Sequence, residues 1–456
     1  MTKKLLIKGA RVLCPANRID STMDILLESQ KVKDVGLNLN VTENVMTIDA
    51  SGLMLAPGFI DLHCHLREPG FEHKETVKSG SAAAIKGGFT TICAMPNTDP
   101  VADDAASIQF LIDKAKGQPV RVLPIGSATK NSEGKELTEM AEMVEVGAVA
   151  FSDDGHPIAN DVLMRHALEY SSALGVPIID HCEVPGLFTN GQINEGWVAS
   201  RLGLQGIPSA AEEQMVDRNI GLAKLTGGWV HLAHVSTKGS VESIRNAKKL
   251  GINITAEVTP HHLTLTENAI LHGINQEGAY KALNENAYNT MAKVNPPLRT
   301  QADVEALIEG LSDGTIDIIA TDHAPHASIE KLCPMQAAAF GISNLETTLA
   351  SALSLVHNKK LSLNRMIESV TSSPAALLKG SNNKIGQLTK GFSGDLTLFD
   401  LDADWIVDVD QFVSKGKNSP LNGERMKGKV VLTVYKGQIV YSDLNYSDLN
   451  KDLVYK

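Results

Sequence analysis

The segment GFIDLHCHLREPG, residues 58–70, places two histidines where they could bind one metal ion. Side chains alternate between the two faces of a β-strand, so we expect His63 and His65 to point the same way and Cys64 to point the opposite way. Pro69 and Gly70 then end the strand. Composition alone can also produce a His-x-His pair, so a metal site needs support from elsewhere in the chain.

Further histidines and aspartates follow other apolar segments, in FSDDG, IIDHCE, WVHLAHVST and IIATDHAPH. Taken singly, each residue has an ordinary structural interpretation, because a lone histidine is more often hydrogen-bonded in a core and an aspartate often forms a turn or caps a helix. Independent structural roles would not all fall at the same end of the apolar segments. The shared position therefore indicates a metal site made of four histidines and two aspartates: His63, His65, His181, His234, Asp322 and one of Asp153 and Asp154.

Histidine and carboxylate ligands without cysteine suit zinc in a catalytic role. Six ligands are more than one tetrahedral ion can use while keeping an open position, so we expect two zinc ions per subunit that share a carboxylate. Their charge exceeds that of two aspartates and a bridging hydroxide, and Arg67 lies nearby in the sequence. This balance favours an anionic substrate. Metal binding lowers the pKa of water from 15.7 to roughly 7, which supplies a hydroxide near neutral pH.

Eight apolar segments that resemble strands alternate with longer stretches rich in Ala, Leu, Glu and Lys. Such alternation predicts parallel β/α units, and eight units predict an α/β fold of the (β/α)8 TIM-like barrel type, with a doubly wound sheet as the competing architecture. The active site of such a barrel lies at the C-terminal ends of its strands, where the histidines and aspartates fall. The predicted strands are 58–66, 88–97, 120–129, 147–155, 175–183, 229–237, 252–260 and 316–326.

Both ends of the chain lack the alternation of strand-like and helix-like segments and consist of short predicted strands and turns. Residues 1–55 are of this kind, and near residue 385 the pattern returns in GDLTLFDLD and in GKVVLTVYKGQIVY, where Lys436-Gly437 suggests a hairpin. Because the termini of a domain often lie close together, we expect the two ends to form one small β-sandwich. The predicted boundaries are 1–55 for its N-terminal part, 56–370 for the metal-dependent catalytic barrel and 371–456 for its C-terminal part.

Composition limits the partners. The net charge of −11 argues against nucleic acid or an anionic membrane surface, because both attract basic patches. No stretch approaches the roughly 18 apolar residues that cross a bilayer, and the N-terminal apolar run is too short for a secretory signal. The five cysteines are odd in number and scattered, which predicts no disulfide framework and a cytoplasmic location.

The motifs LHCHLREPG, CAMPN, FSDDG, DHCE, HVST, KVNPPLR and ATDHAPH together resemble those of the dihydroorotases of the amidohydrolase superfamily, and most closely their bacterial class I branch. The resemblance extends from about residue 5 to residue 440 and includes GDLTLFD. It implies a zinc-dependent enzyme that interconverts N-carbamoyl-L-aspartate and L-dihydroorotate in pyrimidine biosynthesis.

Carried onto this sequence, the resemblance implies that His63, His65 and Asp322 hold a buried zinc and that His181 and His234 hold a more exposed one. It favours Asp154 over Asp153 for the bridging place that many relatives give to a carboxylated lysine. Asp322 would be the catalytic residue and would shuttle a proton. The residues implied at the substrate are His65, Arg67, Asn97, Asn295, His326, Phe340 and Gly341.

Some nearby residues are interpreted as supporting groups rather than ligands. His261 and His262 follow the seventh predicted strand, and Glu183 lies two residues after His181, so all three are expected behind the ligands. His156 could lie near the mouth of the barrel, but the sequence assigns it no role.

Two rival functions remain. Hydantoinases and allantoinases also open cyclic amides on this barrel, although they resemble one another in using a carboxylated lysine, where this chain has FSDDG. Some dihydroorotase-like chains are structural partners of aspartate carbamoyltransferase after losing their metal ligands, whereas all six positions are filled here. We expect a homodimer that acts on a small molecule, and association with aspartate carbamoyltransferase in addition to catalysis stays open.

Overall fold

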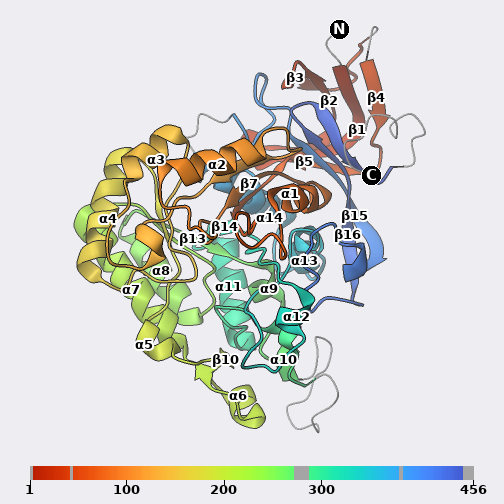
Figure 1. Ribbon diagram of the computed structural model, residues 1–456. Coiled ribbons are helices and arrows are strands. Elements are labelled where there is room, and N and C mark those ends of the chain that lie inside the picture. Colours follow the sequence, from red (N-terminus) through yellow and green to blue (C-terminus); the bar gives the residue numbers. More distant parts are fainter. Residues whose placement is uncertain (1–3, 42–44, 272–286, 379–383, 445–456) are drawn as a thin grey trace.

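The chain forms one sheet from its two ends and a set of parallel strands covered by helices (Figure 1). This computed structural model describes residues 4–41, 45–271, 287–378 and 384–444. No helix within these ranges is long and apolar enough to cross a membrane.

The parallel strands follow one another in the order of the sequence. β6, β7 and β8 pair in that order, and β9, β12, β13 and β14 form a second parallel set. Single parallel bridges join Gly126 to Phe151 and Phe151 to Ile178, and a further one joins His323 to Cys64. The strands are β6 (Phe59–Cys64), β7 (Phe89–Ala94), β8 (Arg121–Pro124), β9 (Ile178–Asp180), β12 (Val230–Leu232), β13 (Ile254–Val258) and β14 (Ile318–Ile319).

The segment 147–155 departs from its prediction as a full strand, because only Phe151 forms bridges to its neighbours. The backbone N–H of Ser152 still donates to the carbonyl of Gly126 at 2.8 Å, and local hydrogen bonds follow it. The Ser152 hydroxyl accepts from the backbone N–H of Asp154, and the carbonyl of Asp153 accepts from the backbone N–H of His156. Short polar side chains of this kind compete with strand pairing. The turn directs the two aspartates away from the strand path.

Helices cover the parallel strands on the outside, and several begin at side-chain caps. Thr76, Asp104 and Thr300 each accept a hydrogen bond from the backbone N–H three residues later, at the start of α1, α2 and α11. The longer helices are α1 (Val77–Lys86), α2 (Ala105–Ala115), α3 (Met140–Val146), α4 (Asp161–Leu174), α7 (Ser209–Thr226), α8 (Lys238–Lys249), α11 (Gln301–Asp313), α13 (Thr348–His357), α14 (Leu363–Val370) and α15 (Ser372–Leu377).

Shorter elements lie in the connections. They are η1 (Pro15–Asn17), η2 (Lys130–Ser132), α5 (Pro185–Phe188), β10 (Ile193–Asn194), α6 (Trp197–Leu202), β11 (Gly206–Ile207), α9 (Pro260–Thr264), α10 (Asn268–Leu271), η3 (Thr290–Ala292), α12 (Ser328–Lys331) and η5 (Val409–Gln411).

Both ends of the chain contribute to one mixed sheet, in the region where the sequence predicts a small β-sandwich. Its order is β17-β16-β15-β5-β1-β2-β3, with β4 paired to β1, and one apolar cluster joins its N- and C-terminal strands. The hairpin between β16 and β17 is confirmed, and Lys436 and Gly437 both have positive φ, as its tight turn requires. The strands are β1 (Lys4–Cys14), β2 (Ile19–Glu28), β3 (Lys31–Gly36), β4 (Val45–Asp49), β5 (Met54–Pro57), β15 (Leu396–Ile406), β16 (Arg425–Tyr435) and β17 (Gln438–Ser442).

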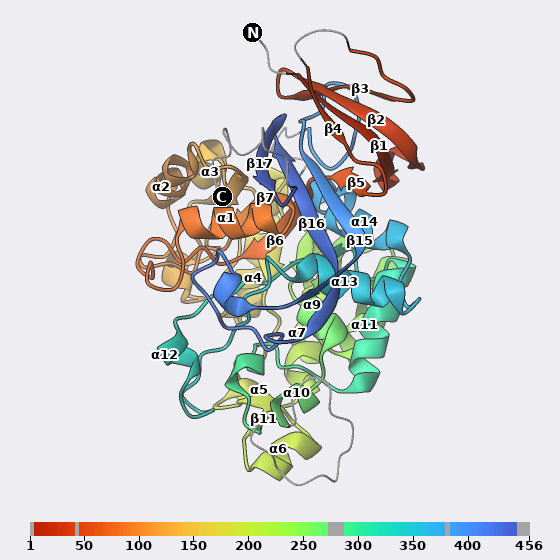
Figure 2. The same ribbon diagram turned by 90° about the vertical axis from the view of Figure 1, so that its right-hand side faces the viewer.

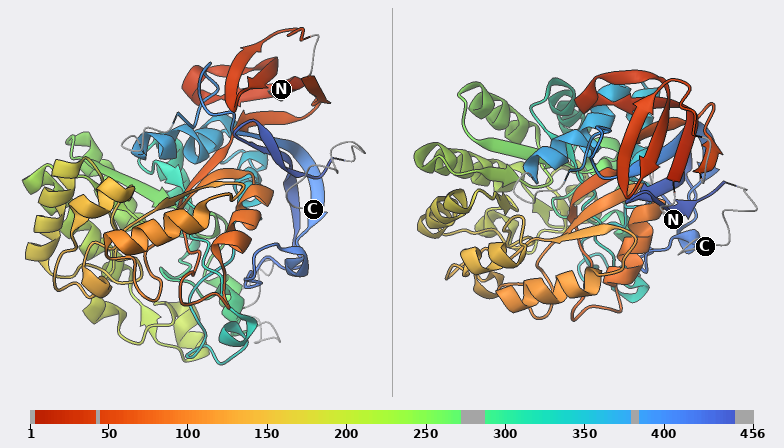
Figure 3. Two further views of the ribbon diagram at one scale, coloured as in Figure 1. Left: turned by 45° about the horizontal axis from the view of Figure 1, so that its top comes forward. Right: turned by 90° about the horizontal axis from the view of Figure 1, so that it is seen from above.

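The terminal sheet docks on the parallel strands through β15. Figure 2 shows β15 and β16 passing alongside α13, and Figure 3 shows the red N-terminal strands beside the blue C-terminal ones. The ring of Phe399 lies 6.2 Å from that of Phe59. The hydroxyl of Thr397 donates to the carbonyl of Gly88 at 2.6 Å. Gly88 has positive φ, and a Cβ there would lie 2.6 Å from Thr397, so this contact requires glycine.

Candidate active site

The predicted ligands converge where the parallel strands end. His63 lies in β6, His181 follows β9, and His234 follows β12, while Asp154 and Asp322 follow the bridge at Phe151 and the strand β14. All are buried. His234 and Asp322 have φ of 30° and 43°, an uncommon backbone conformation for non-glycine residues.

Asp61 connects the two strands that carry the first ligand group. Its carboxylate accepts from the backbone N–H of Thr321 at 2.8 Å and from the Thr321 hydroxyl at 2.6 Å. The backbone N–H of His65 donates to the carbonyl of His323 at 2.9 Å. These bonds fix the end of β6 against the segment that follows β14, and so bring His65 beside Asp322.

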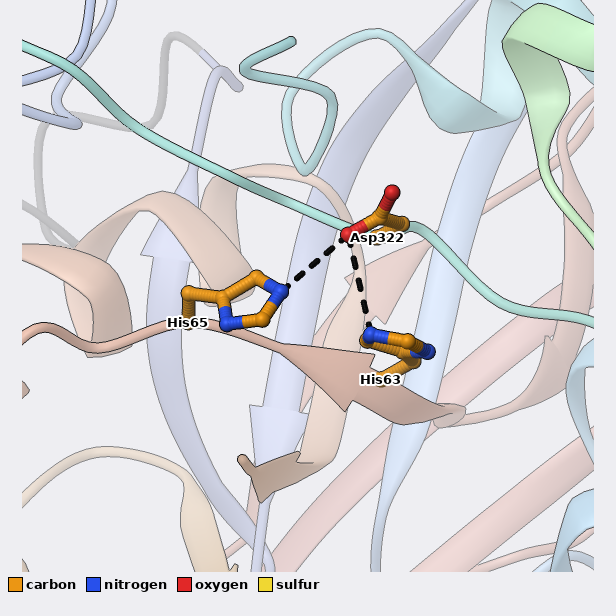
Figure 4. Close-up of side chains that lie close together, drawn as sticks. All are labelled: His63, His65 and Asp322. Carbon is orange, nitrogen blue, oxygen red and sulfur yellow. Dashed lines mark hydrogen bonds and ion pairs between the residues drawn. The ribbon is translucent and has the colours of Figure 1, made fainter. Parts of the chain in front are cut away.

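His63, His65 and Asp322 form one group with potential ligand atoms within 4.8 Å of one another. Figure 4 shows both rings directed at the Asp322 carboxylate. The Oδ1 atom of Asp322 lies 3.2 Å from Nε2 of His65 and 3.6 Å from Nε2 of His63. The two histidines therefore share a face, as strand alternation predicts.

His63, Asp154 and His234 form a second group that shares His63 with the first. Oδ1 of Asp154 lies 3.3 Å from Nε2 of His63 and 3.6 Å from Nε2 of His234. Nδ1 of His181 lies 3.8 Å from the same oxygen, and it is 2.9 Å from Nε2 of His234. Asp154 thus lies between the histidines of both groups.

Asp153 faces away from these histidines. Its carboxylate accepts hydrogen bonds from the hydroxyl of Ser127 at 2.7 Å and from the backbone N–H of Thr129 at 2.9 Å. The hydroxyl of Thr129 also donates to it. The sequence left a choice between the two aspartates, and the geometry brings Asp154 to the cluster while Asp153 binds the segment after β8.

The donor set fits a divalent cation. Nε2 of His63 and Oδ1 of Asp154 are buried, face each other at 3.3 Å, and have no hydrogen-bond partner in the described part of the chain. Buried polar atoms nearly always have a partner, so two such atoms side by side among other nitrogen and carboxylate donors indicate a shared cation.

Charge in the cluster supports the same conclusion. Burial alone raises the pKa of Asp154, but the surrounding histidines, with His63 foremost, lower it well below its usual value. Burial lowers the pKa of His63 and His181, yet the neighbouring carboxylates raise both, that of His181 to about 9. The ionised carboxylates favour the protonated form of the histidines. A divalent cation would balance the same negative charge.

Glu257 is a functional candidate that sequence reasoning missed. This buried residue of β13 accepts from Nδ1 of His63 at 2.6 Å and from Nε2 of His231 at 3.1 Å. A carboxylate on the far nitrogen fixes the ring orientation of a ligating histidine and increases its basicity. The available signal was a charged residue inside an apolar strand, ITAEV.

A cavity of about 270 Å³ opens onto the cluster. Its wall includes Phe188 and Val294, which add apolar surface, and five of the six predicted ligands, since His63 lies behind them. Every residue predicted to bind substrate lines it: His65, Arg67, Asn97, Asn295, His326, Phe340 and Gly341.

Arg67 and His326 form one side of the cavity. Nη2 of Arg67 lies 3.5 Å from Nε2 of His326, and Nε of Arg67 donates to the carbonyl of Pro325 at 3.4 Å. Nε2 of His326 is also 2.8 Å from the carbonyl of Phe340. The guanidinium is thereby held at the cavity wall, where it can meet an anion.

The two predicted asparagines contact the ligand histidines. Oδ1 of Asn97 lies 2.8 Å from Nδ1 of His65, and its amide nitrogen lies 3.5 Å from Oδ2 of Asp154. Nδ2 of Asn295 lies 3.2 Å from Nε2 of His181. Each asparagine therefore borders both the cavity and the cluster.

The expected supporting groups also lie behind the ligands. Glu183 is 3.7 Å from Nε2 of His181. Nδ1 of His261 accepts from Nδ2 of Asn344 at 2.8 Å, and Nε2 of His262 donates to the carbonyl of Pro296 at 2.9 Å; both rings are buried. His156 is exposed.

Comparison with known proteins agrees with this geometry. The Dihydro-orotase-like family profile matches residues 52–240, and the Amidohydrolase family profile matches residues 293–441. The dihydroorotase of Syntrophus aciditrophicus is 45% identical over 96% of this chain and all of its own length. The dihydroorotase of Citrifermentans bemidjiense is 47% identical over 96% of this chain and 99% of its own. The chain belongs to the dihydroorotase family.

Solved structures show the wider fold. The L-hydantoinase (dihydropyrimidinase) of Arthrobacter aurescens superposes with a TM-score of 0.83 and 26% identity, over 97% of this chain and 96% of its own. The family is an amidohydrolase family with metal-dependent chemistry, and the two ligand groups described above are candidates for that metal.

We expect Glu257→Gln to weaken metal binding about 10- to 100-fold, because a neutral amide no longer increases the basicity of His63. Chelator competition, followed by metal analysis of the protein, measures this affinity. Glu242→Gln on the exposed side of α8 is the matched control and should leave the affinity unchanged. Equal affinities for the wild type and Glu257→Gln would contradict the role given to Glu257.

Proposed function

We propose that this protein catalyses the reversible cyclisation of N-carbamoyl-L-aspartate to L-dihydroorotate in pyrimidine biosynthesis. Two curated relatives of nearly equal length carry the name dihydroorotase. The observation that carries the proposal is the shared cavity, in which Arg67 faces a cluster of histidines and aspartates. An anionic cyclic amide fits such a site, because Arg67 can bind its carboxylate while its reacting carbonyl lies at the cluster of histidines and aspartates.

Two zinc ions per subunit are part of the proposal. His63, His65 and Asp322 would hold one, His181 and His234 the other, and Asp154 lies between both sets. Bound there, the ions would polarise the reacting carbonyl and lower the pKa of water.

Asp322 is proposed as the proton shuttle. Burial opposes its ionisation, but His65 and His63 lower its pKa below the usual range, so the carboxylate is ionised; its place at the cavity wall puts it within reach of the reacting groups. In hydrolysis it takes the proton of the attacking water and passes it to the departing ring nitrogen; in cyclisation it moves the proton the opposite way.

Arg67 is proposed to bind the substrate carboxylate through the two parallel N–H groups of its guanidinium. Asn97, Asn295, His326 and the Phe340-Gly341 backbone would orient the rest of the substrate, and all of them line the cavity.

We also infer a closed (β/α)8 barrel. The bridges at Phe151 supply the missing strand between β8 and β9, and the bridge between His323 and Cys64 joins the last segment to the first. An open doubly wound sheet would leave both edges unpaired. The terminal sheet as a β-sandwich, with the division 1–55, 56–370 and 371–456, is proposed alongside; the apolar cluster between its N- and C-terminal strands supports it.

Assembly and location are further proposals. A homodimer and an association with aspartate carbamoyltransferase are carried over from the family resemblance. A cytoplasmic location is supported by the five cysteines, which are all free thiols.

The proposal is tested by assaying the purified wild-type protein with dihydroorotate, hydantoin and allantoin and by analysing its metal content. We expect dihydroorotate to have by far the highest kcat/KM, with about two zinc ions per chain. Faster hydrolysis of hydantoin or allantoin would favour the rival cyclic-amide hydrolases. Metal without turnover of any of the three would favour a structural role.

Asp322→Asn should retain much of the metal, because an amide oxygen can still act as a ligand. Turnover should fall by about 10²–10⁴-fold, the usual contribution of a positioned acid or base. Dihydroorotate hydrolysis and metal analysis on the same sample measure both. Asp217→Asn, an exposed change on α7, is the control, and near wild-type turnover in Asp322→Asn would remove its proton-shuttle role.

Arg67→Lys should chiefly raise KM for dihydroorotate, by roughly tenfold, since a lysine cannot offer two parallel N–H groups. Steady-state kinetics separate this effect from a change in kcat. Arg165→Lys, which alters an exposed ion pair with Glu169 on α4, should leave KM as it is. An unaltered KM in Arg67→Lys would take Arg67 out of the binding site.

A further inference from the structure

A segment from the C-terminal part of the chain reaches the cavity wall. Residues 414–419 lie between η5 and β16, far in the sequence from the parallel strands, yet Ser414, Asn418 and Ser419 are buried. Gly416 lies against Pro325, where an added Cβ would approach the proline ring carbon to 2.4 Å. The segment is therefore packed directly behind residues that face the cavity.

Both polar atoms of the Asn418 side chain form hydrogen bonds to the cavity wall and to Ser343. Its Oδ1 accepts from the backbone N–H of His326 at 2.9 Å and from the hydroxyl of Ser343 at 2.8 Å. Its Nδ2 donates to the carbonyl of Ala324 at 2.9 Å and to that of Gly341 at 3.0 Å. An amide can donate twice and accept twice, so this one is fully satisfied.

The groups that Asn418 binds belong to two adjacent walls of the cavity, which a parallel bridge between His323 and Ile342 and a backbone hydrogen bond from Ala324 to Ile342 also join. Ala324 and His326 lie on the segment after β14, and Gly341 lies on the segment after α12, and all three line the cavity. The planar amide of Asn418 bonds the backbones of both walls beyond the end of this pairing, at His326 and Gly341, and so helps to fix their separation there. Displacements of about 1 Å in a binding site are costly, and buried side chains that hold the contacting residues prevent them.

Other side chains hold the second wall in place independently. Nζ of the buried Lys331 donates to the carbonyls of Ala339 and Gly341 at 2.8 and 3.0 Å, and to that of Lys293 at 3.1 Å. Nζ of Lys293 donates to the carbonyls of Met335 and Ala338, each at 2.7 Å. A change at Asn418 should therefore alter the position of the wall without unfolding it.

We propose that Asn418 is a positioning residue for substrate binding, which sets His326 and Gly341 at the separation that the substrate requires. The inference rests on the proposed function, because its readout is the binding of dihydroorotate. Asn418 touches neither the ligand cluster nor Asp322 in any contact of the described chain, so it acts on the binding of the substrate rather than on the chemical step.

Asn418→Asp provides the test, because it keeps the size and one acceptor but places a carboxylate oxygen against two carbonyls. We expect KM for dihydroorotate to rise about tenfold or more, with kcat within about threefold of the wild type and an unchanged metal content. A purely structural role would instead lower the melting temperature and leave KM unaltered.

Asn422→Asp is the matched control, three residues beyond this segment and before β16. Oδ1 of the exposed Asn422 accepts from the backbone N–H of Val409, away from the cavity, so KM should not change. If Asn418→Asp does not fold, KM for dihydroorotate is measured on Asn418→Ala instead.

An unchanged KM in a folded Asn418 variant overturns the positioning role. Failure of both variants to fold also overturns it, because Asn418 would then be a residue of general stability. Absence of turnover in the wild type would instead overturn the proposed function itself.

Discussion

The concentration of negative charge at the ends of the parallel strands governs the rest of this structure. Asp154, Asp322 and Glu257 are all buried, and an isolated buried carboxylate is strongly unfavourable. Each is stabilised by histidines that come from other strands, as in the contact between Asp322 and His65. The carboxylates and histidines are therefore mutually dependent, and the fold must deliver both sets to one place. A divalent cation at this point satisfies the same electrostatic requirement and supplies the chemistry.

Around this cluster the chain uses polar contacts between backbone segments to fix distances. Asp61 fastens Thr321 to β6, Lys331 ties the carbonyls of the cavity wall, and Asn418 joins two walls. These bonds connect residues that are 10, 94 and 260 positions apart in the sequence. Since buried hydrogen bonds are directional and expensive to leave unmade, they define one geometry more sharply than apolar packing alone. The terminal sheet contributes in the same way, because the segment that leads into β16 packs behind the cavity wall and bonds its backbone.

The sequence predicted those parts of the site that follow local rules. Strand alternation placed His63 and His65 on one face, and the position of polar residues after apolar runs identified the other candidates. It could not choose between Asp153 and Asp154 by the residues alone, because the choice depends on Ser127 and Thr129, which draw Asp153 away. It also overestimated the strand at 147–155, where only Phe151 forms bridges and a turn over residues 152–156 ends the pairing. Glu257 and Asn418 were missed because their partners are far away in the chain, and no spacing rule reveals such contacts.

The scaffold by itself does not determine the substrate, because hydantoinases share this fold and a fold can host many activities. The distinction must lie in the side chains of one small cavity and in what holds them. Here a guanidinium, two amides and a backbone segment surround the cluster, and their positions depend in part on residues outside the cavity lining, such as Asn418 and Lys331. If binding specificity is set by the separation of two walls, then it can change through substitutions in the C-terminal segment while every ligand residue stays the same. The terminal sheet and its connections are, on this argument, part of the specificity of the enzyme as well as of its stability.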